Sequence, residues 1–346
     1  MTAHGASALA TMGTFLRERY ETLGVLPRTG CGDPGGVAVW ADSSDHRTRQ
    51  SGQVLADTLA PGCHLSARWR QQAGEDPVFN AAASGICPLD EGRSMAALDE
   101  AIAAPIPDDA RAALATLQAR FAPHACQDAK KTCLLRPVTA AWKNGAPHLS
   151  GGLTTAATAA ENLLLEYEEG MSPAADAGAR NEAEARSLIA AAMPAHRYET
   201  ALMRRLPELA AHRGAVMARL VLDTLAHGPA RLLVLAGHDS NLDMLSPLFG
   251  LHWDLPEQPD QTAPDTTLAF ELWRMPSGEQ VVRTVVFFQS PDQVRHLLPL
   301  DHGGTPHSLE VIPAACAASS SRCGLDLVAH AVEAAIPASC HAASME

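Results

Sequence analysis

Two segments of the chain share one order of apolar and polar positions. In residues 36–60, GVAVWADSSDHRTRQSGQVLADTLA, a β-rich apolar run ends at Ala41, a polar loop follows, and a helical period begins near Thr48. Residues 231–250, RLLVLAGHDSNLDMLSPLFG, repeat this order. Strand, polar loop and helix form the unit of an α/β fold, in which functional residues collect beyond the carboxyl ends of the strands. The pattern therefore predicts that Arg47 and the pair His238–Asp239 lie at such ends.

The rest of the chain shows a helical period in the middle and a strand pattern near the end. Residues 88–225 are rich in Ala, Leu, Glu and Arg at helical spacing, which predicts a mainly helical domain inserted into an α/β domain made of residues 1–87 and 226–346. TTLAFELWRM and EQVVRTVVFFQ flank Pro-Ser-Gly and predict a β-hairpin at an edge of the sheet. MTAHGASALATMGTFLRERY predicts an amphipathic first helix, and LDLVAHAVEAAI predicts the last helix.

Composition narrows the class of protein and its partners. The 346 residues are long enough for two domains, and 47% apolar residues supply a sizeable core. A formal net charge of −13 argues against nucleic acid or an anionic membrane as partner. No apolar stretch reaches the ~18 residues of a membrane helix. The N-terminus has neither the basic nor the apolar region of a signal peptide.

The 15 histidines change the charge with pH. If most of them are protonated at about pH 5, they offset most of the negative charge, and an anionic substrate is then repelled less. This favours a protein that works in acid. The alternative is that many of these histidines are incidental surface residues.

The eight cysteines indicate either disulfide bonds or a metal site. Cys126 and Cys133 have six intervening residues, as do Cys316 and Cys323, whereas paired zinc ligands usually have two to four. Both pairs lie in polar loop sequence, where a disulfide closes a small loop. Disulfides are therefore favoured over zinc and over buried thiols, and they indicate an oxidising compartment. The connectivity of the eight residues stays open at this level.

The candidate site residues suit an anionic ester. A helix N-terminus attracts anions through its free N–H groups, and Arg47 beside one such terminus offers a bidentate clamp for phosphate. His238 beside the other terminus is a second donor, and Asp239 is a candidate general acid for a leaving oxygen. The alternatives are that Asp239, Ser240 or Asn241 only caps the helix and that Arg47 is solvated. Nothing in the sequence indicates a metal or an organic cofactor.

At this point the chain resembles a known family, the histidine acid phosphatases, in particular the bacterial periplasmic phytase and glucose-1-phosphatase group. The resemblance is weak at residues 95–150 and 172–205. It implies a histidine-phosphatase-like (phosphoglycerate-mutase-like) α/β fold with a helical insertion. The segments that carry it are VAVWADSSDHRTRQSGQVLADTLAPGC, DPVFNAAASGIC, LVLAGHDSNL, FELWR, VVFFQSPDQVR and IPASC.

The resemblance also implies roles and disulfides. In this family a histidine attacks the phosphorus atom and water then releases phosphate from the phospho-histidine. Arg47 matches the phosphate clamp, His238 the second active-site histidine and Asp239 the proton donor. The residues implied to line the substrate pocket are Asp42, Glu161, Arg213 and Ser240. The implied bridges are Cys31–Cys63, Cys87–Cys340, Cys126–Cys133 and Cys316–Cys323. The implied protein is a periplasmic or secreted monomer without cofactor that acts on phytate or a sugar phosphate.

One motif of the family is absent. The string R-H-G-x-R-x-P, whose histidine is the nucleophile, does not occur in the sequence. The first predicted helix matches the helix that follows this motif, so the chain is expected to begin downstream of the first strand, the nucleophile loop and any signal peptide. Without that first strand, the sheet is expected to have unpaired edges. Without the nucleophile, no phospho-enzyme is expected to form. The two interpretations are an N-terminally truncated, inactive acid phosphomonoesterase and a non-catalytic relative that binds phosphorylated ligands.

Overall fold

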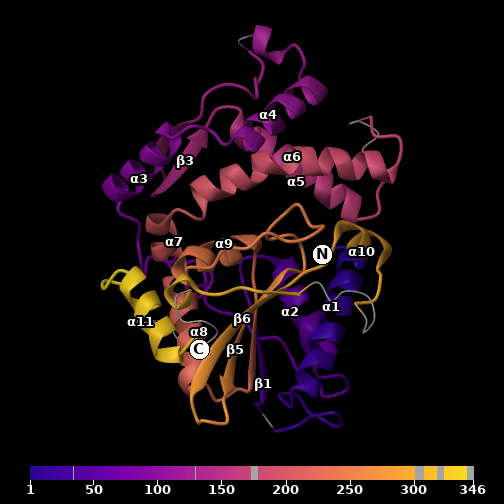
Figure 1. Cartoon of the computed structure of the whole chain (residues 1–346), viewed down its shortest axis with the longest axis vertical. Coiled ribbons are helices and arrows are strands. Elements are labelled where there is room, and N and C mark those ends of the chain that lie inside the picture. Colours follow the sequence, from indigo (N-terminus) through magenta and orange to yellow (C-terminus); the bar gives the residue numbers. More distant parts are fainter. Residues whose placement is uncertain (34, 129, 173–177, 301–307, 318–322, 341–346) are drawn as a thin grey trace.

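The chain forms an α/β body and a mainly helical body that lies across one end of it (Figure 1). The computed structural model describes residues 1–33, 35–128, 130–172, 178–300, 308–317 and 323–340. The α/β body holds the strands β1 (Val37–Ala41), β4 (Leu232–Ala236), β5 (Thr267–Arg274) and β6 (Gln280–Phe287). The domain boundaries at residues 87/88 and 225/226 stay predictions.

The strands of the α/β body form two separate sheets. β1 and β4 pair in parallel from Val37 opposite Leu232 to Ala41 opposite Ala236, so their carboxyl ends meet. The predicted hairpin is present, with β6 between β5 and β7 (Ser308–Glu310). Among the described residues, no ladder joins β4 to β5.

Helices cover both faces of these strands (Figure 1). α1 (Ala3–Thr22) and α2 (His46–Leu59) lie on one side, where Met12 and Leu59 pack with Phe287. α8 (Ala215–His227) and α11 (Leu325–Ala335) lie on the other side, where Val216 and Val332 pack with Val286. This burial of apolar side chains, at about 1.5–3 kcal/mol each, fixes β6 between the two layers.

The second body is built from α3 (Glu91–Ala103), α4 (Asp108–Phe121), α5 (Leu153–Glu168) and α6 (Glu182–Met203), with a small hairpin of β2 (Thr139–Lys143) and β3 (Ala146–Ser150). Its core contains the buried Leu117, Leu164 and Ile189. The Asn181 side chain accepts the Glu184 N–H at 3.0 Å and caps the start of α6. α6 ends above the α/β body, and its C-cap residue is Arg204.

Shorter helices connect the two bodies. α7 (Pro207–Arg213) and α9 (Asp239–Leu248) pack on each other, and α10 (Pro291–His296) lies beside α5. Two 3₁₀ turns are η1 (Ala125–Gln127) and η3 (Ala314–Cys316). No helix in the described ranges has the length and apolar character needed to cross a membrane.

The eight cysteines form four disulfide bonds. They are the bonds that the family resemblance implies: Cys31–Cys63, Cys87–Cys340, Cys126–Cys133 and Cys316–Cys323. The preference for disulfides over zinc and over buried thiols is therefore confirmed. Cys87–Cys340 has a sequence separation of 253 and ties the segment after α11 to the segment before α3.

Candidate anion-binding site at the carboxyl ends of β1 and β4

The loops after the two parallel strands bring the first candidate residues together. Asp42 follows β1, and its backbone N–H donates to the Ala236 carbonyl at the end of β4 at 2.9 Å. His238 follows β4, and its Nε2 lies 3.0 Å from Asp42 Oδ2. The parallel register therefore orients the imidazole of His238 by a carboxylate from the neighbouring strand.

Asp42 is held as a carboxylate in this position. It accepts hydrogen bonds from the Ser44 N–H at 3.0 Å and the Ser44 hydroxyl at 2.8 Å. Burial alone raises the pKa of Asp42, but the hydrogen bonds from His238 and Ser44 lower it, and the pKa lies below its usual value. The contact with this carboxylate fixes the orientation of the His238 imidazole beside the N-terminus of α9.

The start of α9 is held by hydrogen bonds of the Asn241 side chain, the last residue of the segment His238–Asn241. The Asn241 side chain accepts the His238 backbone N–H at 2.8 Å and donates to the Phe79 carbonyl at 2.8 Å. Gly237 allows this approach, because an added Cβ would lie 2.4 Å from Asn241 Oδ1 and 2.8 Å from the Phe79 ring. Asn241 thus has a structural role in this segment, because its side chain joins the start of α9 to the Phe79 loop.

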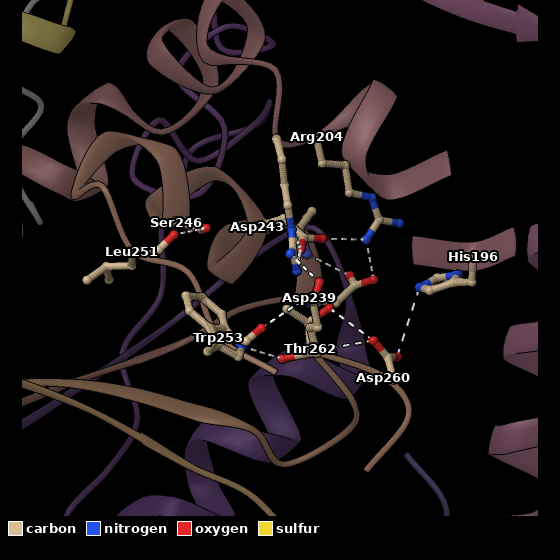
Figure 2. A network of polar contacts seen from close by, with 12 residues as sticks. His196, Arg204, Asp239, Asp243, Ser246, Leu251, Trp253, Asp260 and Thr262 are labelled. Carbon is tan, nitrogen blue, oxygen red and sulfur yellow. Dashed lines mark hydrogen bonds and ion pairs between the residues drawn. The ribbon is translucent and has the colours of Figure 1, made fainter. Parts of the chain in front are cut away.

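Asp239 belongs to a network of ions at the junction of the two bodies (Figure 2). Its Oδ2 accepts a hydrogen bond from Arg204 Nη1, which also lies 3.3 Å from Asp243 Oδ2. Arg205 Nε donates to Asp243 Oδ1 at 2.8 Å. Burial raises the pKa of Asp239, but the charge and hydrogen bond of Arg204 lower it, so the pKa lies below its usual value. Free Asp239 is therefore a carboxylate, which cannot donate a proton.

A second buried pair borders this network (Figure 2). His196 Nε2 on α6 lies 3.9 Å from Asp260 Oδ2, and both side chains are buried. Burial lowers the pKa of His196 and raises the pKa of Asp260. Both shifts favour the neutral forms of the two side chains.

The predicted site residues Ser240, Glu161 and Arg213 lie on three different helices. Ser240 follows Asp239 in the first turn of α9, and Glu161 on α5 faces His196. Arg213 is partly buried at the end of α7, donates to the Met203 carbonyl and lies close enough to Arg204 for mutual repulsion.

Arg47 is not brought into this network. Its side chain is 65% exposed, and Nε lies 3.3 Å from Asp45 Oδ2 in the same loop. The helix α2 that carries it begins shortly after the carboxyl end of β1. The role of Arg47 as a phosphate clamp stays a prediction.

Sequence reasoning missed the partners of Asp239. Asp243, Arg204 and His196 come from two helices far apart in the sequence. The one available signal was the four-residue spacing of Asp239 and Asp243, which places both carboxylates on one face of a helix. Two such carboxylates require cations nearby, and the adjacent Arg204 and Arg205 at the end of α6 supply them.

Comparisons with known proteins place this geometry in a family. The family model for the histidine phosphatase superfamily (branch 2) matches residues 1–287. Phytase AppA of Escherichia coli (strain K12) is 28% identical over 341 residues, which cover 91% of this chain and 78% of that protein. The glucose-1-phosphatase of Salmonella typhimurium is 22% identical over 308 residues, which cover 86% of this chain and 73% of that protein.

Solved phytase structures share the fold over almost the whole chain. Hafnia alvei phytase in complex with tartrate matches 99% of this chain and 89% of its own, with a TM-score of 0.89 and 28% identity. The same phytase in complex with myo-inositol hexakis sulphate has a TM-score of 0.87. Citrobacter braakii phytase matches 99% of this chain and 90% of its own, with a TM-score of 0.89 and 25% identity.

Proposed function

This chain belongs to the histidine phosphatase superfamily (branch 2), and we propose that its site is that of a phytase-like acid phosphomonoesterase, which binds the phosphate group of a small phosphate monoester. The observation that carries the proposal is the side-by-side placement of His238, oriented by Asp42, and Asp239 at the N-terminus of α9. The helix N-terminus attracts phosphate oxygens, and the His238 imidazole beside it offers a ring N–H donor. Asp239 adjoins them, where a leaving oxygen needs a proton.

The donors and cations near the N-terminus of α9 support an anionic substrate. Small phosphorylated molecules, phytate or a sugar phosphate, fit a site that combines His238, Arg204 and Arg213 with a helix N-terminus. The sulfated inositol bound by Hafnia alvei phytase supports a polyanionic ring as ligand. Four disulfides support a periplasmic or secreted location. We also propose that the protein is a monomer that uses no cofactor and binds neither nucleic acid nor a membrane.

Turnover is a separate question, because it requires a nucleophile at phosphorus. The motif R-H-G-x-R-x-P is absent from the 346 residues, and removal of a nucleophile from such a catalytic set abolishes most of the rate. The second function that we propose is binding of the phosphate ester without hydrolysis. His238 and Asp239 then supply the binding and proton-donating half of the reaction alone.

Calorimetry at about pH 5 with phytate, combined with a phosphate-release assay, tests the proposal. We expect phytate to bind, and phosphate release in the same samples distinguishes the phosphomonoesterase from the protein that only binds the ester. The change His238→Ala is expected to weaken binding by about 10- to 100-fold, the range for a lost hydrogen bond to a charged group. The matched control is His252→Ala, because that imidazole is 82% exposed and lies 3.9 Å from Asp254 on the surface.

Each other outcome assigns a different function. If wild type releases phosphate and Asp239→Asn slows release most for poor leaving groups, the site is catalytic and Asp239 is the general acid. If neither phytate nor a sugar phosphate binds, the proposed site is wrong. Equal losses in the two histidine variants would show that His238 acts only through the net charge of the protein.

A further inference from the structure

We propose that Arg204 is a latch on Asp239: it holds Asp239 as a carboxylate in the free protein and moves to the anion when a ligand binds, which allows Asp239 to take up a proton. Arg204 is then a positioning residue that couples anion binding to protonation of the proton donor. The inference rests on the proposed function, because it needs an anionic ligand next to Asp239.

Both oxygens of Asp239 are occupied by donors in the free protein. Oδ1 accepts the Ser240 backbone N–H at 2.8 Å, and Oδ2 accepts Arg204 Nη1 (Figure 2). A proton on the lone pair of Oδ2 that accepts the Arg204 hydrogen bond would point at the guanidinium, and the two donors would repel each other. Protonation of Asp239 at this lone pair therefore requires Arg204 to move away.

Arg204 has a second anchor that keeps it in the network when it leaves Asp239. The buried Asp243 lies 3.3 Å from Arg204 Nη1, but the main partner of Asp243 is Arg205, at 2.8 Å from Nε and 2.7 Å from Nη2. Asp243 thus keeps a counter-ion without Arg204. The Arg204 side chain is 25% exposed, whereas the Asp243 side chain is 0% exposed. Arg204 is the cation of the network that is free to change partner.

The position of Arg204 gives it room to move. It is the C-cap residue of α6, where the helix ends with an irregular backbone (φ −122°, ψ −33°). It therefore leads into the segment between α6 and α7 and is not held by a helical turn on both sides. A small change at this cap swings the guanidinium between Asp239 and a ligand on the N-terminus of α9.

An anion acts on this arrangement in two ways that reinforce each other. It attracts Arg204, and it repels the carboxylate of Asp239, so both effects favour protonation of Asp239. By linkage, the free energy that binding adds to protonation equals the free energy that protonation adds to binding. Charged and titratable groups from every element packed against Asp239 surround it. Those at α6 are His196, Glu199, Arg204 and Arg205, and the others are Glu161 on α5, Arg213 on α7, His238 and Asp243 at α9, and Asp260 in the following loop.

Several of these groups also take up protons when an anion binds, so the contribution of Asp239 has to be isolated. Inositol hexakissulfate is the suitable probe, because its sulfate esters stay ionised and take up no protons themselves. Titrations at about pH 5 in buffers with different ionisation enthalpies give the number of protons taken up on binding. The difference between wild type and Asp239→Asn is the part that belongs to Asp239.

We expect this difference to be close to one proton in the wild-type background. In the Arg204→Gln background we expect it to fall to a small fraction of a proton, because Asp239 without its counter-ion is already protonated before the ligand arrives. Arg204→Lys keeps the charge but loses the bridging guanidinium, and it should give an intermediate value. The matched control is Arg197→Gln on the same helix, whose guanidinium lies 3.3 Å from the distant Asp109; it should keep the wild-type difference.

The outcomes separate the latch from the proposed function. Binding of the sulfate ester with no Asp239 difference in the wild type would show a fixed structural ion pair and overturn the latch alone. An equal difference in the wild-type and Arg204→Gln backgrounds would also overturn it. Absence of binding in the wild type overturns both the latch and the proposed site. Near-ultraviolet circular dichroism of each variant identifies any loss of fold. If Arg204→Gln does not fold, the proton uptake of the Arg204→Lys variant tests the latch in its place.

Discussion

Replacement of both Cys87 and Cys340 by alanine is expected to lower the free energy of unfolding by about 5 kcal/mol on a chain-entropy model. The reason is the sequence separation of 253 residues between the two cysteines. Their bond restricts the unfolded chain more than any of the other three disulfides. It also fixes the segment after α11 against the body that carries α7 and α9, so its loss reaches the candidate site.

Urea unfolding at about pH 5 measures this loss, and the pair Cys126→Ala with Cys133→Ala is the matched control. That bond has a sequence separation of only 7, and its loss is expected to cost about 2.5 kcal/mol on the same model. Each double variant removes both cysteines of one disulfide bond, so neither variant contains a free thiol. Equal losses in the two double variants would show that loop length does not set the contribution of the Cys87–Cys340 bond.

Local patterning was sufficient to predict the elements that carry the site. The apolar run that ends at Ala41 and the run before His238 became β1 and β4, and the helical periods after them became α2 and α9. Because parallel strands align their carboxyl ends, the same patterns predicted that these two loops meet. The family and the α/β fold inferred from the ordered motifs are confirmed by the family model and by the phytase structures.

The helical period over residues 211–228 did not reveal the break between α7 and α8. The break lies at Gly214, where an added Cβ would meet Leu248 Cδ1 at 2.8 Å and Met244 Cβ at 3.1 Å. The close approach of α9 thus requires a residue without a side chain at this point. Periodicity reports the face of a helix but not the distance of the element that packs on it, so this break was not predictable.

The partners of Asp239 were beyond prediction for a similar reason. Arg204 and Asp239 are 35 residues apart and belong to different bodies. Nothing in the local sequence of either residue specifies the other. The pairing exists because the end of α6 lies over the start of α9, which depends on the packing of α5 and α6 in the helical body. Hydrophobic packing outside the site therefore decides the protonation state of the proposed proton donor.

The free energy of unfolding is expected to fall as the pH rises from about 5 to about 7.5. Among the residues that the structure describes, burial raises the pKa of five carboxyl groups, and for Asp265 it raises the pKa to about 7. The others are Glu168, Glu199, Asp243 and Asp260. A raised pKa means that the folded state binds more protons than the unfolded state above about pH 4. Stability from these groups is therefore complete in acid and is lost as the pH rises through each folded pKa.

Groups with lowered pKa values set the acid limit of this stability. Asp42 and Asp239 have pKa values below the usual range, so the stability they contribute is present above about pH 4 and is lost below it. Burial lowers the pKa of His196, so this group adds stability as the pH rises toward the usual histidine pKa. Its single contribution opposes those of the five carboxyl groups with raised pKa values. The maximum of stability is thus expected at mildly acidic pH.

Asp265→Asn isolates one of these groups, because asparagine tolerates the left-handed backbone of residue 265, whose φ is +64°. One carboxyl that is protonated only in the folded state contributes a slope of about 1.4 kcal/mol per pH unit. Urea unfolding at pH values of about 5, 6 and 7.5 should therefore show a shallower decline for this variant than for wild type. The control is Asp254→Asn, whose side chain is 74% exposed and should leave the slope unchanged. A wild-type stability that is flat or rises over this interval would show that the buried carboxyls ionise without cost, and the acid optimum of the fold would then be wrong.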